Sequence, residues 1–179
     1  MAADAVRLLV ITGSMGSGKT TVLGEASDLL ASQGITHAAI DADALANGHL
    51  PAGVNLKDGN LRAMVQNYIL AGVRMFLVAE AVESRRDLES IHEAAGTSDI
   101  VVCRLRAPLN VMQQRVRVRE PGLLQQTFLE RVVSLEALLD AVSLEDFSLT
   151  NDEHCSVTAV ATELLVRIGW LASAPNPAY

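Results

Sequence analysis

The sequence predicts a single α/β domain in which helices cover both faces of a five-stranded parallel sheet. Strand and helix patterns alternate along all 179 residues, as they do in repeated β-α-β units with right-handed crossovers. Three of the expected helices end in a glycine shortly before the next strand, at Gly34, Gly72 and Gly96, a common helix terminator. Half of the residues are hydrophobic and only 3% are aromatic, so we expect an aliphatic core around a buried sheet.

Five short, mostly aliphatic runs are expected to form the strands. They are residues 6–12, 37–41, 73–79, 100–105 and 147–149. Helical patterns lie between them at 21–32, 61–71, 84–96, 108–119, 123–142 and 157–171. Ser84 and Asp87 have the spacing of a capping box, and Pro108 suits the first position of a helix. Residues 120–122, Glu-Pro-Gly, break the helical pattern between the fourth and fifth helices.

Composition and charge exclude several functional classes. The net charge of −7 argues against nucleic acid as the main partner, which would favour a basic surface. No apolar run reaches the roughly 18 residues of a membrane span. Cys103 and Cys155 lack metal-ligand spacing and a disulfide-rich context, so we expect reduced thiols. A functional motif already begins at residue 13, which leaves no room for a signal peptide. A cytoplasmic protein is expected.

That motif is the segment Gly13–Thr20, of the form G-x-x-x-x-G-K-[ST]. It lies between an expected strand and an expected helix, where backbone N–H groups surround an anion at a helix N-terminus. Lys19 would reach the β- and γ-phosphates, and the Thr20 hydroxyl would bind Mg²⁺. We therefore expect a nucleoside triphosphate to contact the consecutive residues Gly13, Ser14, Met15, Gly16, Ser17, Gly18, Lys19, Thr20 and Thr21.

Two acids follow the second expected strand, and ligands of open α/β sheets bind at the carboxyl ends of the strands. Phosphoryl transfer needs a carboxylate that orients and deprotonates the attacking hydroxyl, and often another that holds Mg²⁺ through water. Asp41 and Asp43 are the candidates, and which of them is the base stays open. Asp43 could instead simply cap a following helix.

Charged residues also stand at the carboxyl ends of the third and fourth strands. Glu80, with Glu83 shortly after it, could hold Mg²⁺ through water or could be a solvated helix-start residue. Arg104 and Arg106 would add positive charge beside the phosphate loop. The sequence therefore predicts a phosphoryl-transfer site at this edge of the sheet.

A helix rich in arginine precedes the break at 120–122. A spacing of four places Arg115 and Arg119 on one face, while Arg117 points away. Arginines on a segment that closes over the phosphates would neutralise the charge that develops on the transferred group. We therefore expect residues 113–127 to form a short lid, with Arg115 and Arg119 as catalytic residues. An ordinary charged surface helix is the alternative.

These elements together resemble the P-loop kinases. The resemblance is carried by residues 13–20, 41–43, 104–108, 115–119 and 146–152. The Asp-x-Asp after the second strand is similar to shikimate, gluconate and adenylylsulfate kinases, and the layout also resembles chloramphenicol phosphotransferase. In that family an Asp after the second strand is the base for the drug hydroxyl, which implies this role for Asp41 or Asp43. Residues 80–83 lack the Asp-Gly-x-Pro-Arg element of nucleoside monophosphate kinases, which argues against a monophosphate acceptor.

The resemblance implies a kinase that moves the γ-phosphate of ATP or GTP, with Mg²⁺, to a hydroxyl of a small molecule. A secondary metabolite or antibiotic is the favoured acceptor, and a nucleotide or adenylylsulfate-type kinase is the alternative. A non-catalytic nucleotide-binding regulator is a second alternative, and a homodimer is left open. Residues 50–61, rich in Gly, Asn and Pro, would set acceptor specificity, and His49 would lie nearby. Residues 173–179 are expected to fray at the end of the single domain 1–179.

Overall fold

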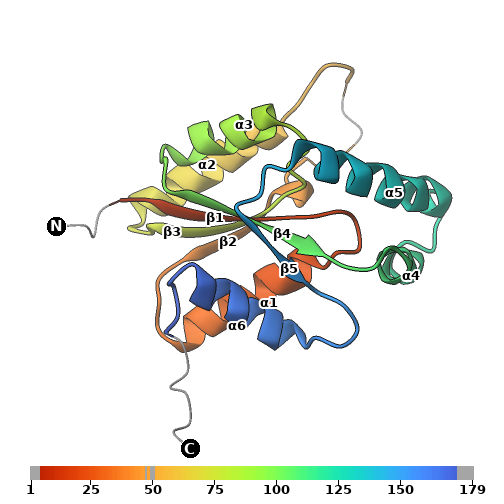
Figure 1. Ribbon diagram of the computed structural model, residues 1–179. Helices are drawn as coiled ribbons and strands as arrows, with labels where there is room; N and C mark the ends of the chain where they lie inside the picture. Colours follow the sequence, from red (N-terminus) through yellow and green to blue (C-terminus); the bar gives the residue numbers. More distant parts are fainter. Residues whose placement is uncertain (1–4, 47, 49–50, 173–179) are drawn as a thin grey trace, which may run out of the picture.

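The fold is a parallel sheet between two layers of helices (Figure 1). A computed structural model describes residues 5–46, 48 and 51–172. The tail at 173–179 and His49, for which the sequence made predictions, lie outside the described residues. No helix among the described residues is both long and apolar enough to cross a membrane.

Five strands form the sheet, and every strand pair is parallel. They are β1 (Arg7–Thr12), β2 (Ala38–Asp41), β3 (Met75–Ala79), β4 (Ile100–Arg106) and β5 (Phe147–Thr150), in the order β2-β3-β1-β4-β5. β1 is therefore central, and the chain leaves it directly into the phosphate loop. β2 and β3 lie on one side of β1, and β4 and β5 lie on the other. The strand order therefore reverses beside this loop, where ligands of such sheets bind.

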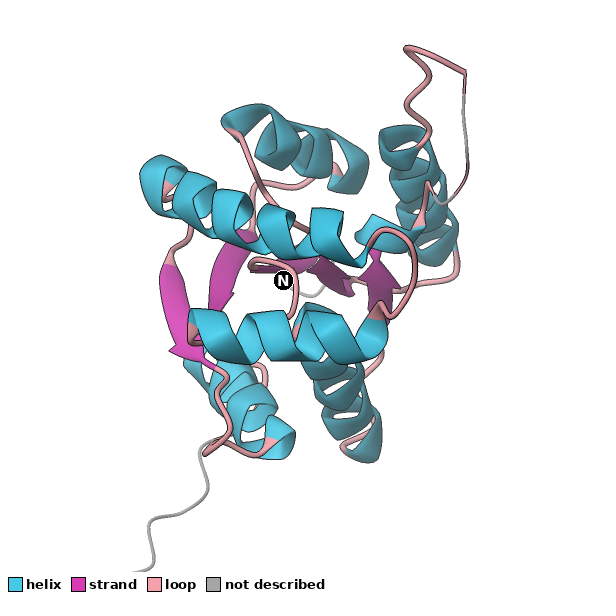
Figure 2. Ribbon diagram, turned by 90° about the vertical axis from the view of Figure 1, so that its right-hand side faces the viewer, coloured by secondary structure: helices cyan, strands magenta, loops and turns pink. Residues whose placement is uncertain are grey.

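The helices are α1 (Lys19–Ser32), α2 (Lys57–Leu70), α3 (Arg85–Ala95), α4 (Leu109–Arg119), α5 (Gln125–Val142) and α6 (Val157–Arg167). α1 and α6 cover one face of the sheet, while α2, α3 and α5 lie on the other. Figure 2, turned by 90°, shows the strands between these two helical layers. The predicted α/β fold with a five-stranded parallel sheet is confirmed.

Successive β1 side chains point to opposite faces and build two cores. Leu9 and Ile11 pack among α1 and α6 residues, whereas Leu8 and Val10 pack toward α2 and α3. A third, smaller cluster joins α4 to α5 through Met112, Val116 and Val132. Because this third cluster lies beside the phosphate loop, α4 and α5 are held near the loop and not over the centre of the sheet.

Two helix boundaries differ clearly from the prediction. α2 begins at Lys57 and not near residue 61, because the Asn55 side chain accepts a hydrogen bond from the Lys57 backbone N–H at 2.9 Å. This contact starts the helix despite Gly59. α6 ends at Arg167 and not at 171, because Gly169 adopts φ +71° and reverses the chain. Both differences depend on local backbone contacts that periodicity does not report.

Candidate functional site

The phosphate loop is packed so tightly that side chains are excluded at two of its glycines. Gly16 has φ +79° and Gly18 has φ +98°, in the left-handed region that favours glycine. A Cβ on Gly16 would overlap the carbonyl oxygen of Met112, and one on Gly18 would overlap the side-chain nitrogen of Asn151. The loop therefore has one shape, set by α4 on one side and by the segment after β5 on the other.

Two side chains hold this shape through backbone carbonyls. Asn151, which is 7% exposed, donates its side-chain N–H to the Ser17 carbonyl at 2.7 Å. Arg115 donates Nη1 to the carbonyls of Gly16 at 3.1 Å and Asn151 at 3.0 Å. With the carbonyls occupied in this way, the N–H groups of the loop are left to face an anion.

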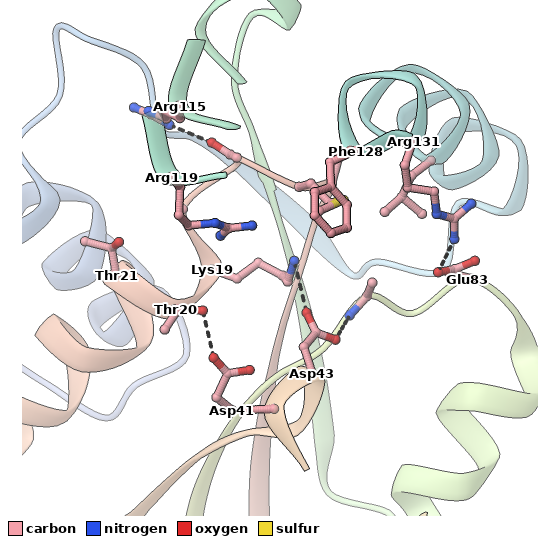
Figure 3. Close-up of a pocket in the computed structure, with 17 residues that line it drawn as sticks. Lys19, Thr20, Thr21, Asp41, Asp43, Glu83, Arg115, Arg119, Phe128 and Arg131 are labelled. Atoms are coloured by element: carbon pink, nitrogen blue, oxygen red, sulfur yellow. Dashed lines mark hydrogen bonds and ion pairs between the residues drawn. The ribbon is translucent and has the colours of Figure 1, made fainter. Parts of the chain in front are cut away.

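Lys19 and Asp43 meet at the centre of the site (Figure 3). Lys19 is nearly buried; its Nζ donates to the Gly13 carbonyl at 3.1 Å and lies 3.3 Å from Asp43 Oδ2. The second Asp43 oxygen accepts the Ala81 backbone N–H at 3.3 Å. Asp43 is thus fixed between the phosphate loop and the loop after β3, and it is part of a short 3-10 helix over Ala42–Ala44.

Thr20 and Asp41 form a pair that suits a magnesium ion. The Thr20 hydroxyl donates to Asp41 Oδ2 at 2.8 Å, and Asp41 Oδ1 is buried without a hydrogen-bond partner. A hydroxyl beside a carboxylate with an unused oxygen fits Mg²⁺, which binds few protein oxygens and completes its octahedron with water and phosphate. The residues present therefore fit the predicted ion.

A cavity of about 740 Å³ opens over these residues. Its walls come from the phosphate loop, the segment after β2, the loop after β3, α4 and α5 (Figure 3). Besides Lys19, Thr20, Asp41 and Asp43, they include Ser14, Met15, Gly16, Gly18, Thr21, Ala44, Ala81, Glu83, Arg115, Arg119, Phe128, Arg131 and Leu135.

The contribution of α5 to the cavity could not be assigned from the sequence. Phe128, Arg131 and Leu135 have the spacing of one helix face, and an arginine within an apolar stripe is the one signal that marks it. Which face would meet the phosphate loop depends on tertiary contacts. One of these is a hydrogen bond of 3.0 Å from the buried Ser14 hydroxyl to the Val132 carbonyl.

Known structures with this arrangement include several kinases. A shikimate kinase from Acinetobacter baumannii, solved with shikimate, superposes with a TM-score of 0.61 and 18% identity, covering 93% of this chain and 95% of that one. The tunicamycin resistance protein of Deinococcus radiodurans gives 0.61 and 18%, covering 95% and 99%. A sugar kinase from Janibacter gives 0.60 and 23%, covering 92% and 96%.

This chain has the P-loop kinase fold. Neither a protein-family model nor a curated protein matches the sequence. At identities this low, the likeness establishes the fold alone.

Within this kinase fold, the predicted site residues differ in whether they line the cavity and in what they contact. Gly13 and Ser17 do not line the cavity: the Gly13 carbonyl accepts Lys19 Nζ, and Ser17 is buried beneath the loop. Arg115 lines it but is engaged with the loop carbonyls. Arg119 also lines it, with Nε 2.9 Å from Glu120 Oε1 and its side chain more than half exposed. The structure thus places Arg119 where it can reorient, and Arg115 where it stabilises the loop.

Glu80 does not line the cavity among the described residues. It is 2% exposed, and its carboxylate contacts Lys57 Nζ at the start of α2. Burial raises the pKa of Glu80, and the Lys57 contact offsets only part of that effect. Burial lowers the pKa of Lys57, but the contact with Glu80 and the negative charges of Asp87 and Asp58 together outweigh this, so the pKa is raised. This ion pair ties the first turn of α2 to the end of β3.

Arg104 and Arg106 were expected beside the phosphate loop, and this expectation is wrong. As alternate residues of β4 they share one face of the strand, and that face is turned to the C-terminal half of α5. Arg104 is fully buried and lies 2.6 Å from Glu136, 2.9 Å from Asp140 and 3.6 Å from Glu145. Arg106, 41% exposed, shares these acids. The acids, separated from both arginines by 30 residues or more, draw the guanidinium groups away from the cavity.

Proposed function

We propose that this protein is a Mg²⁺-dependent kinase that transfers the γ-phosphate of ATP or GTP to a hydroxyl of a small molecule. One observation carries the proposal. The cavity extends past Lys19 and Asp43 to a wall supplied by α5 and the loop after β3, which leaves room for a second substrate next to the donor phosphates. A protein that only binds a nucleotide has no need of such a compartment.

Lys19 and the loop amides would hold the donor phosphates. Lys19 Nζ already has an oxygen ligand in Gly13 and another in Asp43, so donor phosphate oxygens would replace the carboxylate and release Asp43. Thr20 and Asp41 would hold Mg²⁺, which would neutralise charge on the β- and γ-phosphates.

Asp43, once released from Lys19, would accept the proton of the acceptor hydroxyl as the hydroxyl oxygen attacks the γ-phosphorus. The bond from that phosphorus to the oxygen bridging to the β-phosphate would break, and the nucleoside diphosphate would leave. The Ala81 N–H would keep the carboxylate oriented through its second oxygen. In this assignment Asp41 binds the ion, because it contacts Thr20. Asp43 binds the acceptor hydroxyl, because it lies between Lys19 and the Ala81 N–H. Arg119 would turn from Glu120 toward the transferred group, where positive charge favours the transition state.

A secondary metabolite or antibiotic remains the favoured acceptor. The tunicamycin resistance protein supports this choice, since its fold matches over 95% of this chain. The runner-up, a nucleotide or adenylylsulfate-type kinase, is supported by an adenylylsulfate kinase of Mycobacterium tuberculosis with a TM-score of 0.53. A smaller hollow of about 210 Å³ between Arg115, Cys155 and Val157 lies beside Thr21. We assign it to the base of the donor nucleotide.

The test is acceptor-stimulated release of nucleoside diphosphate, screened over hydroxyl compounds with ATP and with GTP. Asp43→Asn should lower the rate by about 10²- to 10⁴-fold, as expected for the loss of a general base, and leave triphosphate affinity unchanged. Asp28→Asn, an exposed change on the far part of α1, is the matched control and should alter neither. If no acceptor stimulates release and a partner protein binds only one nucleotide state, the regulator alternative holds and the kinase proposal fails.

A further inference from the structure

The end of the cavity beyond Asp43 contains an ion pair that the reaction itself does not need. Arg131 Nη2 of α5 lies 2.5 Å from Glu83 Oε1 in the loop after β3. Figure 3 shows both side chains at the side of the cavity that faces away from Thr20 and Asp41. Phe128, one turn before Arg131, forms the adjoining apolar wall. We call Glu83, Phe128 and Arg131 the acceptor subsite.

Both halves of this ion pair are held by structure outside the cavity. The Glu83 backbone N–H donates to Asp87 at 2.9 Å, within the capping box that starts α3. On the other side, the residue after Arg131 accepts the buried Ser14 hydroxyl through its carbonyl. The backbones on both sides are therefore held in place, and the side chains of Arg131 and Glu83, 39% and 35% exposed, meet across the end of the cavity.

A fixed ion pair selects against acids. An anionic group that approached Arg131 would also approach Glu83, and would have to displace a carboxylate that is already paired with the guanidinium. Asp43 lies on the same side, since it binds the N–H of Ala81, two residues before Glu83. Asp43 is paired with Lys19 and Glu83 with Arg131, so neither pair offers a second anion an uncompensated cation, which works against its binding.

A neutral polar group meets no such conflict. A hydroxyl or amide can donate to Glu83 and accept from Arg131 at once, in charge-assisted hydrogen bonds that leave the pair intact. An apolar or ring portion of the same molecule can then lie against Phe128. We propose that the acceptor subsite takes an uncharged polyhydroxyl or amide-bearing compound and rejects carboxylates and phosphates. This inference rests on the proposed kinase function, which gives the reason for an acceptor site, but what it predicts is binding and not turnover.

The test uses alcohols paired with their acids: a hexose with its uronic acid, and a nucleoside with its 5′-monophosphate. Binding to the protein saturated with a non-hydrolysable triphosphate is measured by calorimetry and saturation-transfer NMR, and turnover is measured by diphosphate release. We expect the neutral member of at least one pair to bind about tenfold more tightly than its acid.

Two variants should move this preference in opposite directions. Glu83→Gln leaves Arg131 without a counter-charge, so the preference should shift about tenfold toward acids. Arg131→Gln leaves only negative charge and should strengthen the rejection of acids. Glu93→Gln is the matched control, because Glu93 forms an ion pair with Arg62 at 3.2 Å outside the cavity; it should leave the preference unchanged.

The possible failures are distinguishable. If the neutral compounds bind with the expected preference but none is phosphorylated, the kinase proposal fails and the subsite assignment stands. If acids bind as well as their alcohols, if no neutral compound binds, or if Glu83→Gln leaves the preference unchanged, the subsite assignment is overturned whatever the turnover.

Discussion

Replacing Arg104 by methionine should destabilise the protein much more than the same replacement of Arg106. Methionine keeps most of the apolar volume of the arginine stem and removes the charge. Arg104 is fully buried among Glu136, Asp140 and Glu145, while Arg106 is 41% exposed beside the same acids. The two variants therefore remove the same charge from the same acids and differ mainly in burial.

The magnitudes follow from what each change leaves behind. Without Arg104, Glu136, which is 20% exposed, loses its nearest cation, and Glu145, which is 12% exposed, keeps only Arg106 at 3.4 Å. Removing one partner of a buried pair costs about 3–5 kcal/mol, and the remaining Arg106 places the expected loss near 3 kcal/mol. For a domain of this size that lowers the melting temperature by about 6–12 °C. Loss of Arg106 should cost about 0.5 kcal/mol, as for exposed pairs.

Urea denaturation followed by circular dichroism measures both losses. Neutralising the stranded acids in the variant Arg104→Met with Glu136→Gln and Glu145→Gln should recover at least half of the stability. If that triple variant is as unstable as Arg104→Met alone, the cost arises from packing and not from uncompensated charge. Equal losses for Arg104→Met and Arg106→Met would contradict the argument from burial.

Three further changes test other parts of the structure. Gly16→Ala forces a Cβ into the Met112 carbonyl at φ +79° and should weaken triphosphate binding about tenfold or more in calorimetry; unchanged affinity would show that the loop adapts. Asn151→Ala leaves a buried loop carbonyl unpaired and should cost about 1–3 kcal/mol in urea, so a loss below 0.5 kcal/mol would refute it. Lys57→Met leaves buried Glu80 without its cation and should cost about 3 kcal/mol at pH 8. Burial holds the pKa of Glu80 above its ordinary 4.5, so folding favours the protonated carboxyl. The stability that this protonation contributes is present in acid and is lost as pH rises through the raised pKa. The loss should shrink at pH 5, and a pH-independent loss would contradict this.

The sequence predicted the elements and the phosphate-loop side of the cavity because both depend on local patterns. The glycines and Lys19 of the phosphate loop act through a contiguous motif, and Asp41 and Asp43 follow a strand whose end is readable from its apolar run. The parallel sheet follows from the alternation of these runs with helices. Such signals need no knowledge of which helix packs against which.

The acceptor side was not predictable in the same way because it depends on packing between distant elements. Arg104 was expected beside the phosphate loop because of its place at the end of a strand, but Glu136 and Asp140 bind it from a helix more than 30 residues later. Arg131 received no role, although it lines the cavity, because nothing local shows which face of α5 meets the loop. Charge partners across the fold decided both cases.

α5 connects the two halves of the site, and its contacts predict which kinetic constant each change affects. Its N-terminal half lines the proposed acceptor side of the cavity through Phe128 and Arg131, and its C-terminal half is held by Arg104. The donor loop, in contrast, is held chiefly from α4 and from Asn151. Loosening α5 at Arg104 should therefore raise the KM for the acceptor more than the KM for the triphosphate, whereas Asn151→Ala should do the reverse.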